Sequence, residues 1–256
     1  MSDSYDASPA ISANNIDFSY YSNNGQINIL NNINFELPYG QIVGLIGPNA
    51  SGKSTLLNIL CGRLIPQSGT LNISGTPIYI NGKMLSLPRL SLISQVPINS
   101  LAPTMTVFEN YMLVSNRSNH IWNWAYSRRF RNDCLELLLR AEMGLESKIN
   151  EQTRFLSCGQ QQALAILLSL KEKNSILLMD EPTSSLDVFV SSNIIKLAIR
   201  ETTLKHGLLL LVTHNLKDIL DYTNRVFVLR GGTIVRECMI SGDISDEQTL
   251  RSLMNS

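Results

Sequence analysis

Residues 41–60 read QIVGLIGPNASGKSTLLNIL. They begin with a short apolar run at 41–46, continue through a glycine-bearing turn, and take on helical character from 54 to 60. An apolar run without polar alternation is typical of a strand that is covered on both faces, as strands in parallel sheets are. The order strand, turn, helix therefore predicts a central unit of an α/β fold.

The turn, residues 47–54, satisfies the pattern G-x-x-x-x-G-K-[ST] of phosphate-binding loops. Glycine lets backbone N–H groups point inward at phosphate oxygens, and the helix that follows presents its positive N-terminal end. Lys53 is expected to pair with the β- and γ-phosphates of ATP, and Ser54 to place its hydroxyl on Mg²⁺. The predicted nucleotide-binding residues here are Gly47, Pro48, Asn49, Ala50, Ser51, Gly52, Lys53, Ser54 and Thr55.

Two alternatives to a phosphate-binding loop exist for residues 47–54. One is a chance loop without a ligand, and the strand and helix predicted on either side argue against it. The other is a dinucleotide-binding turn, which needs the pattern G-x-G-x-x-G, and that pattern does not occur in the sequence. The phosphate-binding interpretation is therefore kept.

A second apolar segment, residues 175–179, ends in two acidic residues, Asp180 and Glu181. The carboxyl ends of strands are where open α/β sheets place their ligands. Asp180 could hold the shell of a Mg²⁺ ion, and Glu181 could polarise a water for attack on the γ-phosphate. The alternative for two acids in isolation is a solvated strand end.

The remaining pattern along the chain agrees with a mixed α/β protein. Residues 15–36 form two alternating stretches around a turn, which predicts an antiparallel hairpin. A helical period runs through 128–143. From 175 onward the order becomes strand, helix, strand, as in a parallel sheet with crossovers, and a second hairpin closes the chain. The predicted segments are 176–179, 190–201, 208–212, 225–229 and 233–236.

Composition excludes several classes of partner and location. The 256 residues contain 21 Lys plus Arg against 21 Asp plus Glu, so no basic field suggests nucleic acid. No apolar run approaches the roughly 20 residues that cross a bilayer. The N-terminal residues lack the basic and apolar regions of an export signal, so we expect a cytoplasmic protein with a mobile start at 1–13. The four cysteines are widely spaced and form no CxxC pair, which favours free thiols.

Seven landmarks in sequence order resemble those of the ABC-type ATPases. Each alone has an ordinary structural explanation, such as an outward strand residue, a loop glutamine or a core histidine, but their order is highly specific. The resemblance extends from about residue 16 to residue 236. The landmarks are Tyr20, the loop 47–54, Gln95, the segment LSCGQ at 156–160, Asp180–Glu181, the segment SSLD at 184–187, and Thr213–His214.

This resemblance implies linked roles for three of the landmarks. Tyr20 stacks on adenine, Gln95 senses Mg²⁺ and the attacking water, and His214 contacts the γ-phosphate. The implied catalytic residues are Glu181, His214 and Gln95, and the implied Mg²⁺ contacts are Ser54, Gln95 and Asp180.

The segment LSCGQ precedes a predicted helix, so Ser157, Gly159 and Gln160 sit at a helix N-terminus that favours anions. In proteins that resemble this one, such a surface completes the ATP site of a partner subunit, which implies a homodimer or a pseudo-symmetric dimer. Two positions depart from the usual motif: Cys158 stands where glycine is commonest, and Ala163 replaces a frequent arginine. Cys158 is either a packed small residue or a thiol exposed at the helix start.

The implied fold is a RecA-like P-loop NTPase core with an antiparallel β portion and a helical signature lobe at about 97–170, all within a single ABC ATPase domain at 14–256. Heptad-bearing arms, zinc sites and a second cassette, which mark other branches of the family, are absent from the sequence. A transporter subunit is therefore expected, and the stretches 101–110, 143–146 and 214–216 are similar to importers of amino acids. The alternative is a non-transport ATPase that clamps or scaffolds a soluble partner.

A transporter subunit implies transmembrane permease subunits as partners, with a cargo-binding protein as a further candidate. The chain is then expected to lie in the cytoplasm, attached to the inner face of the cell membrane through the permease. Trp122, Trp124 and Tyr126 fall where transporter ATPases contact a permease, and core packing is the alternative for them.

Overall fold

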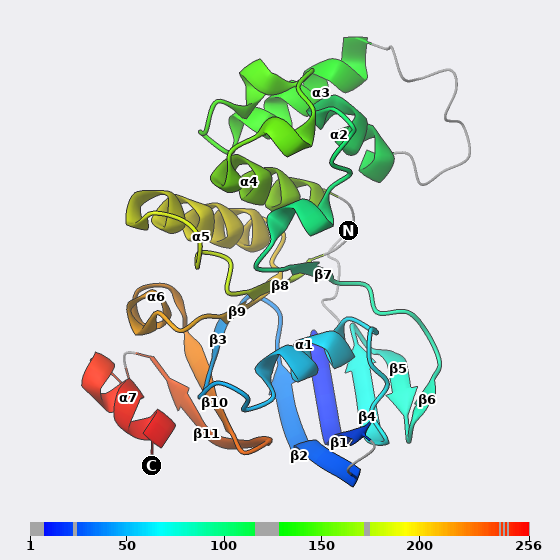
Figure 1. The fold of residues 1–256 in the computed structure, drawn as a ribbon, viewed down its shortest axis with the longest axis vertical. Coiled ribbons are helices and arrows are strands. Elements are labelled where there is room, and N and C mark those ends of the chain that lie inside the picture. Colours follow the sequence, from blue (N-terminus) through cyan, green and yellow to red (C-terminus); the bar gives the residue numbers. More distant parts are fainter. Residues whose placement is uncertain are drawn as a thin grey trace, which may run out of the picture.

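The structure is a computed structural model of the chain, and it describes residues 8–22, 25–115, 128–171, 175–240, 242, 244 and 246–255. Trp122, Trp124 and Tyr126 lie outside the described residues. Within them, the strands form two sheets, and a layer of helices lies on the side of the first sheet away from the second (Figure 1). We call the helices α2 (Val107–Ser115), α3 (Arg128–Leu139), α4 (Cys158–Ser169) and α5 (Val188–Thr203) the helical layer.

The first sheet has the strand order β11-β10-β3-β9-β8-β7. Strands β10, β3, β9, β8 and β7 pair in parallel, and β11 pairs with β10 in the antiparallel direction. This arrangement confirms the predicted buried strands, the crossovers and the closing hairpin. The bounds are β3 Ile42–Ile46, β7 Ser91–Ile93, β8 Ile176–Asp180, β9 Leu208–Val212, β10 Arg225–Arg230 and β11 Thr233–Met239.

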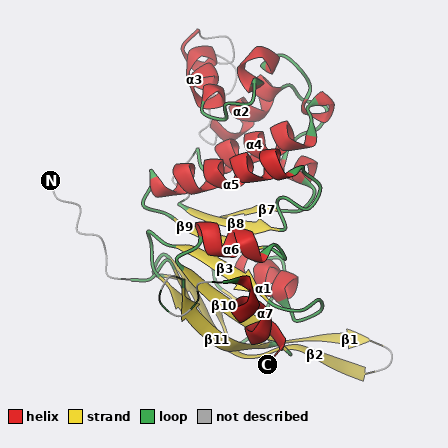
Figure 2. Ribbon diagram, turned by 90° about the vertical axis from the view of Figure 1, so that its left-hand side faces the viewer, coloured by secondary structure: helices red, strands yellow, loops and turns green. Residues whose placement is uncertain are grey.

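The second sheet is antiparallel and has the order β2-β1-β4-β5-β6. Its first two strands form the predicted hairpin, which extends beyond the rest of the molecule (Figure 2). Strand β1 begins at Ile11, a fully buried residue, and so starts inside the stretch 1–13 that we expected to be mobile. The bounds are β1 Ile11–Ser22, β2 Gly25–Leu37, β4 Ser68–Ile73, β5 Thr76–Ile80 and β6 Lys83–Met84.

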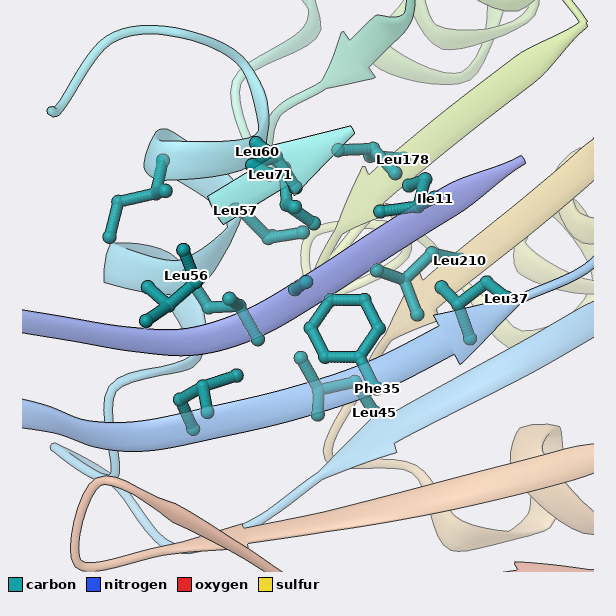
Figure 3. Packing of buried hydrophobic residues seen from close by; sticks show 14 of the residues in the cluster. Ile11, Phe35, Leu37, Leu45, Leu56, Leu57, Leu60, Leu71, Leu178 and Leu210 are labelled. Atoms are coloured by element: carbon teal, nitrogen blue, oxygen red, sulfur yellow. The ribbon is translucent and has the colours of Figure 1, made fainter. Parts of the chain in front are cut away.

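The parallel strands are apolar throughout because both of their faces are covered. On β8, Leu178 points into a cluster shared with the antiparallel sheet and with helix α1 (Lys53–Leu60), whereas Leu177 and Met179 point into the helical layer. Figure 3 shows the first cluster, in which Leu178 and Leu210 of the parallel sheet gather with side chains of α1 and of the antiparallel sheet. The pleat thus sends alternate residues of one strand into two different cores.

All elements described between residues 97 and 169 are helical. Helices α5, α6 and α7 follow later in the chain. The bounds are η1 Pro97–Ser100, α2 Val107–Ser115, α3 Arg128–Leu139, η2 Leu145–Lys148, η3 Thr153–Phe155, α4 Cys158–Ser169, α5 Val188–Thr203, α6 Leu216–Tyr222 and α7 Glu247–Asn255.

Helix α3 ends four residues before the predicted end of its helical period at 143. Beyond Leu139 the chain makes polar contacts with α5. The Arg200 guanidinium donates to the Arg140 carbonyl oxygen and lies 2.9 Å from the Glu142 carboxylate. The Arg140 guanidinium in turn contacts the buried carboxylate of Glu201 on α5 at 2.5 Å. Glu142 adopts a left-handed backbone conformation, φ 55°, so the helix cannot continue through it to 143.

Across the described part of the chain, no helix combines the length and the apolar character that crossing a bilayer requires.

Leu178→Ala should lower the free energy of unfolding by about 2–5 kcal/mol, because it leaves a cavity between the two sheets. Leu87→Ala is the matched control, since Leu87 is 77% exposed, and its effect should stay within about 0.5 kcal/mol. Urea denaturation followed by circular dichroism measures both. Equal effects of the two substitutions would contradict the two-sided burial of β8.

Candidate functional site

The carboxyl ends of three neighbouring parallel strands surround one pocket. Strand β9 lies between β3 and β8, and its Val212 pairs with both Leu45 and Asp180, so the segments that follow these strands emerge at the same edge of the sheet. The pocket has a volume of about 260 Å³, and we call it the loop pocket. Its lining residues are Ile29, Asn49, Ala50, Ser51, Gly52, Lys53, Ser54, Thr55, Asp180, Glu181 and His214.

The Lys53 ammonium lies inside the curve of the predicted phosphate-binding loop. Its Nζ donates to the carbonyl oxygens of Gly47 at 2.8 Å and Pro48 at 2.9 Å. Burial lowers the pKa of Lys53, and the nearby carboxylates of Glu181 and Asp180 oppose that shift. The loop therefore holds a cation among backbone dipoles, in a position from which it can turn toward an anion in the pocket.

Two glycines shape the loop through close approach and backbone conformation. A Cβ on Gly47 would lie 2.0 Å from the carbonyl oxygen of Leu229 on β10, so no larger residue fits there. Gly52, which precedes the first residue of α1, has φ 107°, a left-handed conformation that favours glycine. The Ser51 hydroxyl is buried and has no hydrogen-bond partner, which leaves it available to a ligand oxygen in the loop pocket.

Asp180 ends β8 and faces the loop. Burial raises the pKa of its carboxyl, while a hydrogen bond with the Ser54 hydroxyl and the charge of Lys53 oppose the increase. A hydroxyl and a carboxylate placed together supply the oxygen ligands that Mg²⁺ prefers.

Glu181 turns away from the strand direction. Its φ is 49°, and its N–H donates to the Val212 carbonyl oxygen at 2.9 Å. The carboxylate accepts a hydrogen bond from the His214 N–H at 3.3 Å and lies 3.1 Å from the His214 Nε2. Burial raises the pKa of Glu181, and the charge of His214 is the largest opposing influence. A half-buried carboxylate with a raised pKa suits a proton acceptor near neutral pH.

Tyr20 and Gln95, the other two residues expected on this side of the site, do not line the loop pocket. Tyr20, on β1, is 44% exposed, and its ring makes an edge-to-face contact with that of Phe18, with centroids 4.9 Å apart. Gln95 is exposed two residues after β7. Since Ile93 pairs with Met179, Gln95 leaves the sheet at the same edge as Glu181.

Ser157, Gly159 and Gln160 also lie outside the loop pocket, at the start of α4. Ser157 and Gln160 form a capping box: the Ser157 hydroxyl accepts from the Gln160 N–H at 3.3 Å, and the Gln160 side chain accepts from the Ser157 N–H at 3.2 Å. The Gln160 amide also donates to the Met143 carbonyl oxygen at 3.0 Å.

Gly159 is required within the chain itself. A Cβ there would lie 2.6 Å from Val190 Cγ1 on α5 and 3.2 Å from Met143 Cε. Cys158 is half-buried, with its Sγ 3.5 Å from the Ser185 hydroxyl oxygen. From the sequence, Gly159 was predicted only to lie at a helix N-terminus that favours anions, because its packing partner on α5 is 31 residues away and no local pattern indicates it.

Sequence reasoning also missed Ile29, an apolar residue of β2 that lines the loop pocket. Ile29 belongs to an alternating strand and carries no motif, so only the tertiary arrangement of β2 against the loop shows its place.

The sequence pattern of the ABC transporter family matches residues 30–184 of the chain. The chain belongs to this family. Relatives include a tyrosine transport ATP-binding protein from Clostridioides difficile, 33% identical over 81% of this chain and 82% of its own length. A phosphonates import ATP-binding protein from Trichormus variabilis is 31% identical over 89% of this chain and 92% of its own length.

Solved structures confirm the expected ABC ATPase fold. A bacterial ABC transporter cassette, solved as a dimer, superposes with a TM-score of 0.75 at 27% identity and covers 91% of this chain and 99% of that chain. A component of a Clostridium perfringens ABC transporter complex shares the fold with a TM-score of 0.77 at 23% identity, over 96% of this chain and 94% of that chain. This ABC protein is therefore an ATP-hydrolysing subunit with a RecA-like P-loop core.

Burial of the Asp180 carboxyl predicts how the stability of the nucleotide-free ABC ATPase depends on pH. Because the pKa of Asp180 is raised, the folded chain holds a proton there more tightly than the unfolded chain does. The stability that this carboxyl contributes is fully present below the pKa of the unfolded chain and is lost as pH rises through the folded pKa. Asp180→Asn removes the charge at every pH, so the variant should melt about 2–4 °C higher at pH 7.

The difference in melting temperature should shrink toward zero near pH 4, close to the ordinary pKa of an aspartate. Thermal denaturation at several pH values measures it. If Asp180→Asn melts below the parent protein at pH 7, the attraction to Lys53 outweighs the cost of burying the carboxylate.

Proposed function

We propose that two copies of this ABC ATPase close over two ATP molecules, each bound between the loop pocket of one copy and the start of α4 of the other, to drive an importer. The observation that supports this proposal is that the loop pocket gathers residues from β2, from the loop between β3 and α1, from the end of β8 and from the segment after β9, whereas Ser157 is exposed at the start of α4, outside that pocket. Each copy then supplies the part that the other lacks.

In this proposal the backbone N–H groups of residues 47–54 bind the phosphates of ATP. The Lys53 ammonium exchanges the Gly47 and Pro48 carbonyl oxygens for the β- and γ-phosphate oxygens, which carry more negative charge. The unpartnered Ser51 hydroxyl supports an oxyanion ligand at this place. Tyr20 stacks on the adenine through the exposed part of its ring, a role that its position at the hairpin allows.

We infer that Ser54, Asp180 and Gln95 contact Mg²⁺. Bound there, Mg²⁺ would neutralise charge on the phosphates. Among the described residues, no group of three or more His, Cys, Asp or Glu side chains is placed to hold a metal ion. Such a sparse set of protein ligands fits Mg²⁺, which usually takes one or two carboxylates together with substrate phosphates.

Glu181 is the proposed general base. Its carboxylate accepts a proton from water as the water oxygen bonds to the γ-phosphorus and the bond to the ADP oxygen breaks, leaving ADP and phosphate. The raised pKa of Glu181 favours its acting as a proton acceptor near neutral pH. His214 holds the Glu181 carboxylate through its N–H and its ring, and we assign it a second contact with the γ-phosphate.

The membrane partners are proposed on the strength of the relatives. Permease subunits would receive the closing and opening motion, and they would hold this chain at the cytoplasmic face of the membrane. The tyrosine transport relative supports an amino acid as cargo, delivered by a separate cargo-binding protein. Nucleic acid is not proposed as a partner, since the chain has no net charge. Co-purification with a multi-helix membrane protein separates this function from a clamp on a soluble partner.

Glu181→Gln should leave ATP binding unchanged and slow hydrolysis by at least about 10²-fold, because glutamine cannot accept the proton. The variant should accumulate as an ATP-bound dimer. Phosphate release and sedimentation velocity measure the two effects. Hydrolysis at the parental rate would show that Glu181 is not the base.

Ser157→Asp should separate the two surfaces of the site. Aspartate keeps the helix cap, since it is as good an N-cap as serine, but it places a negative charge where the γ-phosphate of the other copy should lie. In the Glu181→Gln background, we expect the ATP-dependent dimer to weaken at least tenfold while ATP still binds each loop pocket. Ser157→Asn, of the same size and without charge, should dimerise nearly as well as Ser157. Equal dimer dissociation constants for the Asp and Asn variants would contradict the composite site.

A further inference from the structure

We propose that a surface around the C-terminal end of α1 and the loop after β6 binds anionic lipid headgroups directly. The proposal goes beyond the proposed function, in which permease subunits alone hold the chain at the membrane. We call this surface the basic-apolar patch. Its members are exposed cationic and exposed apolar residues, namely Arg63, Ile65, Lys83, Leu85, Leu87 and Arg89.

Charge is unevenly distributed along the chain, and the patch lies in its most basic stretch. The whole sequence balances 21 Lys plus Arg against 21 Asp plus Glu, yet no acidic residue occurs from Leu37 to Phe108, more than a quarter of the length. Three of the four cationic residues in that stretch belong to the patch, and the fourth, Lys53, points into the phosphate-binding loop. Cations without neighbouring acids in the sequence favour an anionic partner.

Tertiary contacts bring the members of the patch together from two segments. A Cβ on Gly62, just after α1, would lie 3.0 Å from Pro88 Cδ and 3.1 Å from Met84 Cε. A Cβ on Gly82 would lie 3.0 Å from the Gln67 carbonyl oxygen. The segment after α1 and the segment around β6 therefore lie against each other at two places. Figure 1 shows β5 and β6 at the edge of the molecule, on the side away from α6 and α7.

The apolar members of the patch point away from the core. Leu87 is 77% exposed, and Leu85 and Ile65 are each about half exposed. In the same segment the core contacts are made by other residues, since Met84 and Leu90 pack against the cluster between the two sheets. Exposed apolar side chains beside cations are the combination with which proteins enter the boundary between lipid headgroups and acyl chains.

The cationic members of the patch are available to an external anion. Within the part of the chain that the structure describes, no ion pair joins Arg63, Lys83 or Arg89 to a carboxylate. Asp17 comes near, since its carbonyl oxygen accepts from the N–H of residue 67. Its carboxylate already accepts hydrogen bonds from the Asn32 N–H at 2.7 Å and from the hydroxyl of residue 68 at 2.6 Å.

A lipid surface suits the patch better than a nucleic acid does. Nucleic acid would use the cations through its phosphates but would gain little from exposed leucines, whereas a membrane takes up both kinds of side chain. The patch also leaves the nucleotide site open. Helix α1 has eight residues, so its C-terminal end lies roughly 12 Å from the phosphate-binding loop at its start.

Cosedimentation of the full chain with vesicles, without permease and without nucleotide, tests the proposal. The chain should bind phosphatidylcholine vesicles that contain phosphatidylglycerol at least about tenfold more tightly than phosphatidylcholine alone, because each cation near an anionic surface contributes about fivefold. Lys83→Gln combined with Arg89→Gln should lower the affinity for the mixed vesicles at least about tenfold. Leu87→Ser should lower it several-fold, and added salt should weaken binding of the parent chain.

Matched controls carry the same changes outside the patch. Lys196→Gln combined with Arg236→Gln removes two exposed cations from α5 and β11, and Leu204→Ser removes an apolar side chain that is 64% exposed. Both should bind the mixed vesicles as the parent does. None of the substituted residues lines the loop pocket, so ATP hydrolysis by every variant should match that of the parent, which verifies the fold.

The outcomes separate this inference from the proposed function. Equal binding to the two kinds of vesicle, or undiminished binding by Lys83→Gln with Arg89→Gln, would overturn the patch as a lipid-binding surface. Binding only to vesicles that carry a reconstituted permease would assign the surface to that subunit and overturn the inference as well. A Glu181→Gln chain that stays monomeric with MgATP would instead overturn the composite site, while lipid binding without nucleotide would still support the patch.

Discussion

The fold depends on parallel strands that are covered on both faces. Along β8 and β9, alternate residues enter two separate apolar cores, so neither strand has a place for a charged side chain until it ends. Polar residues are therefore confined to the strand ends, and parallel pairing brings those ends to one edge. The position of Asp180, of Glu181 and of His214 near the loop before α1 follows from this constraint rather than from any attraction between them.

Concentrating charges at that edge has an electrostatic cost. Burial raises the pKa of both carboxyls and lowers the pKa of Lys53, which is the direction that loss of water produces for each charge. The opposite charges of lysine and carboxylates limit the shifts but do not remove them. Multivalent phosphate with its cation is the kind of ligand that can satisfy such a set, since it brings both signs of charge at once.

The sequence predicted those parts of the protein that local patterns determine. The unbroken apolar run before Gly47, the loop pattern and the acids after Met179 were each sufficient to predict a strand, a turn or a strand end. The strands β4 to β6 were not predicted, because these strands are short and mixed in polarity. They are stabilised by pairing, β4 with β1, β5 with β4 and β6 with β5. Helix α6 has only seven residues and was missed for the same reason. Within the site, Ile29 and the packing of Gly159 could not be predicted, since both depend on contacts between distant segments.

The ion pairs between the end of α3 and α5 have a mechanical consequence. Arg140, Arg200 and Glu201 join the outer helices to α5 through charged contacts, one of them to a buried carboxylate, whereas α5 meets the sheet through apolar side chains that can slide. Helix α5 also begins at the turn that follows Glu181. Helix α5 therefore connects the outer helices, through the charged contacts near its C-terminal end, with the reacting edge at its N-terminal end. A displacement of the outer helices is therefore expected to move the turn that follows Glu181 by way of α5.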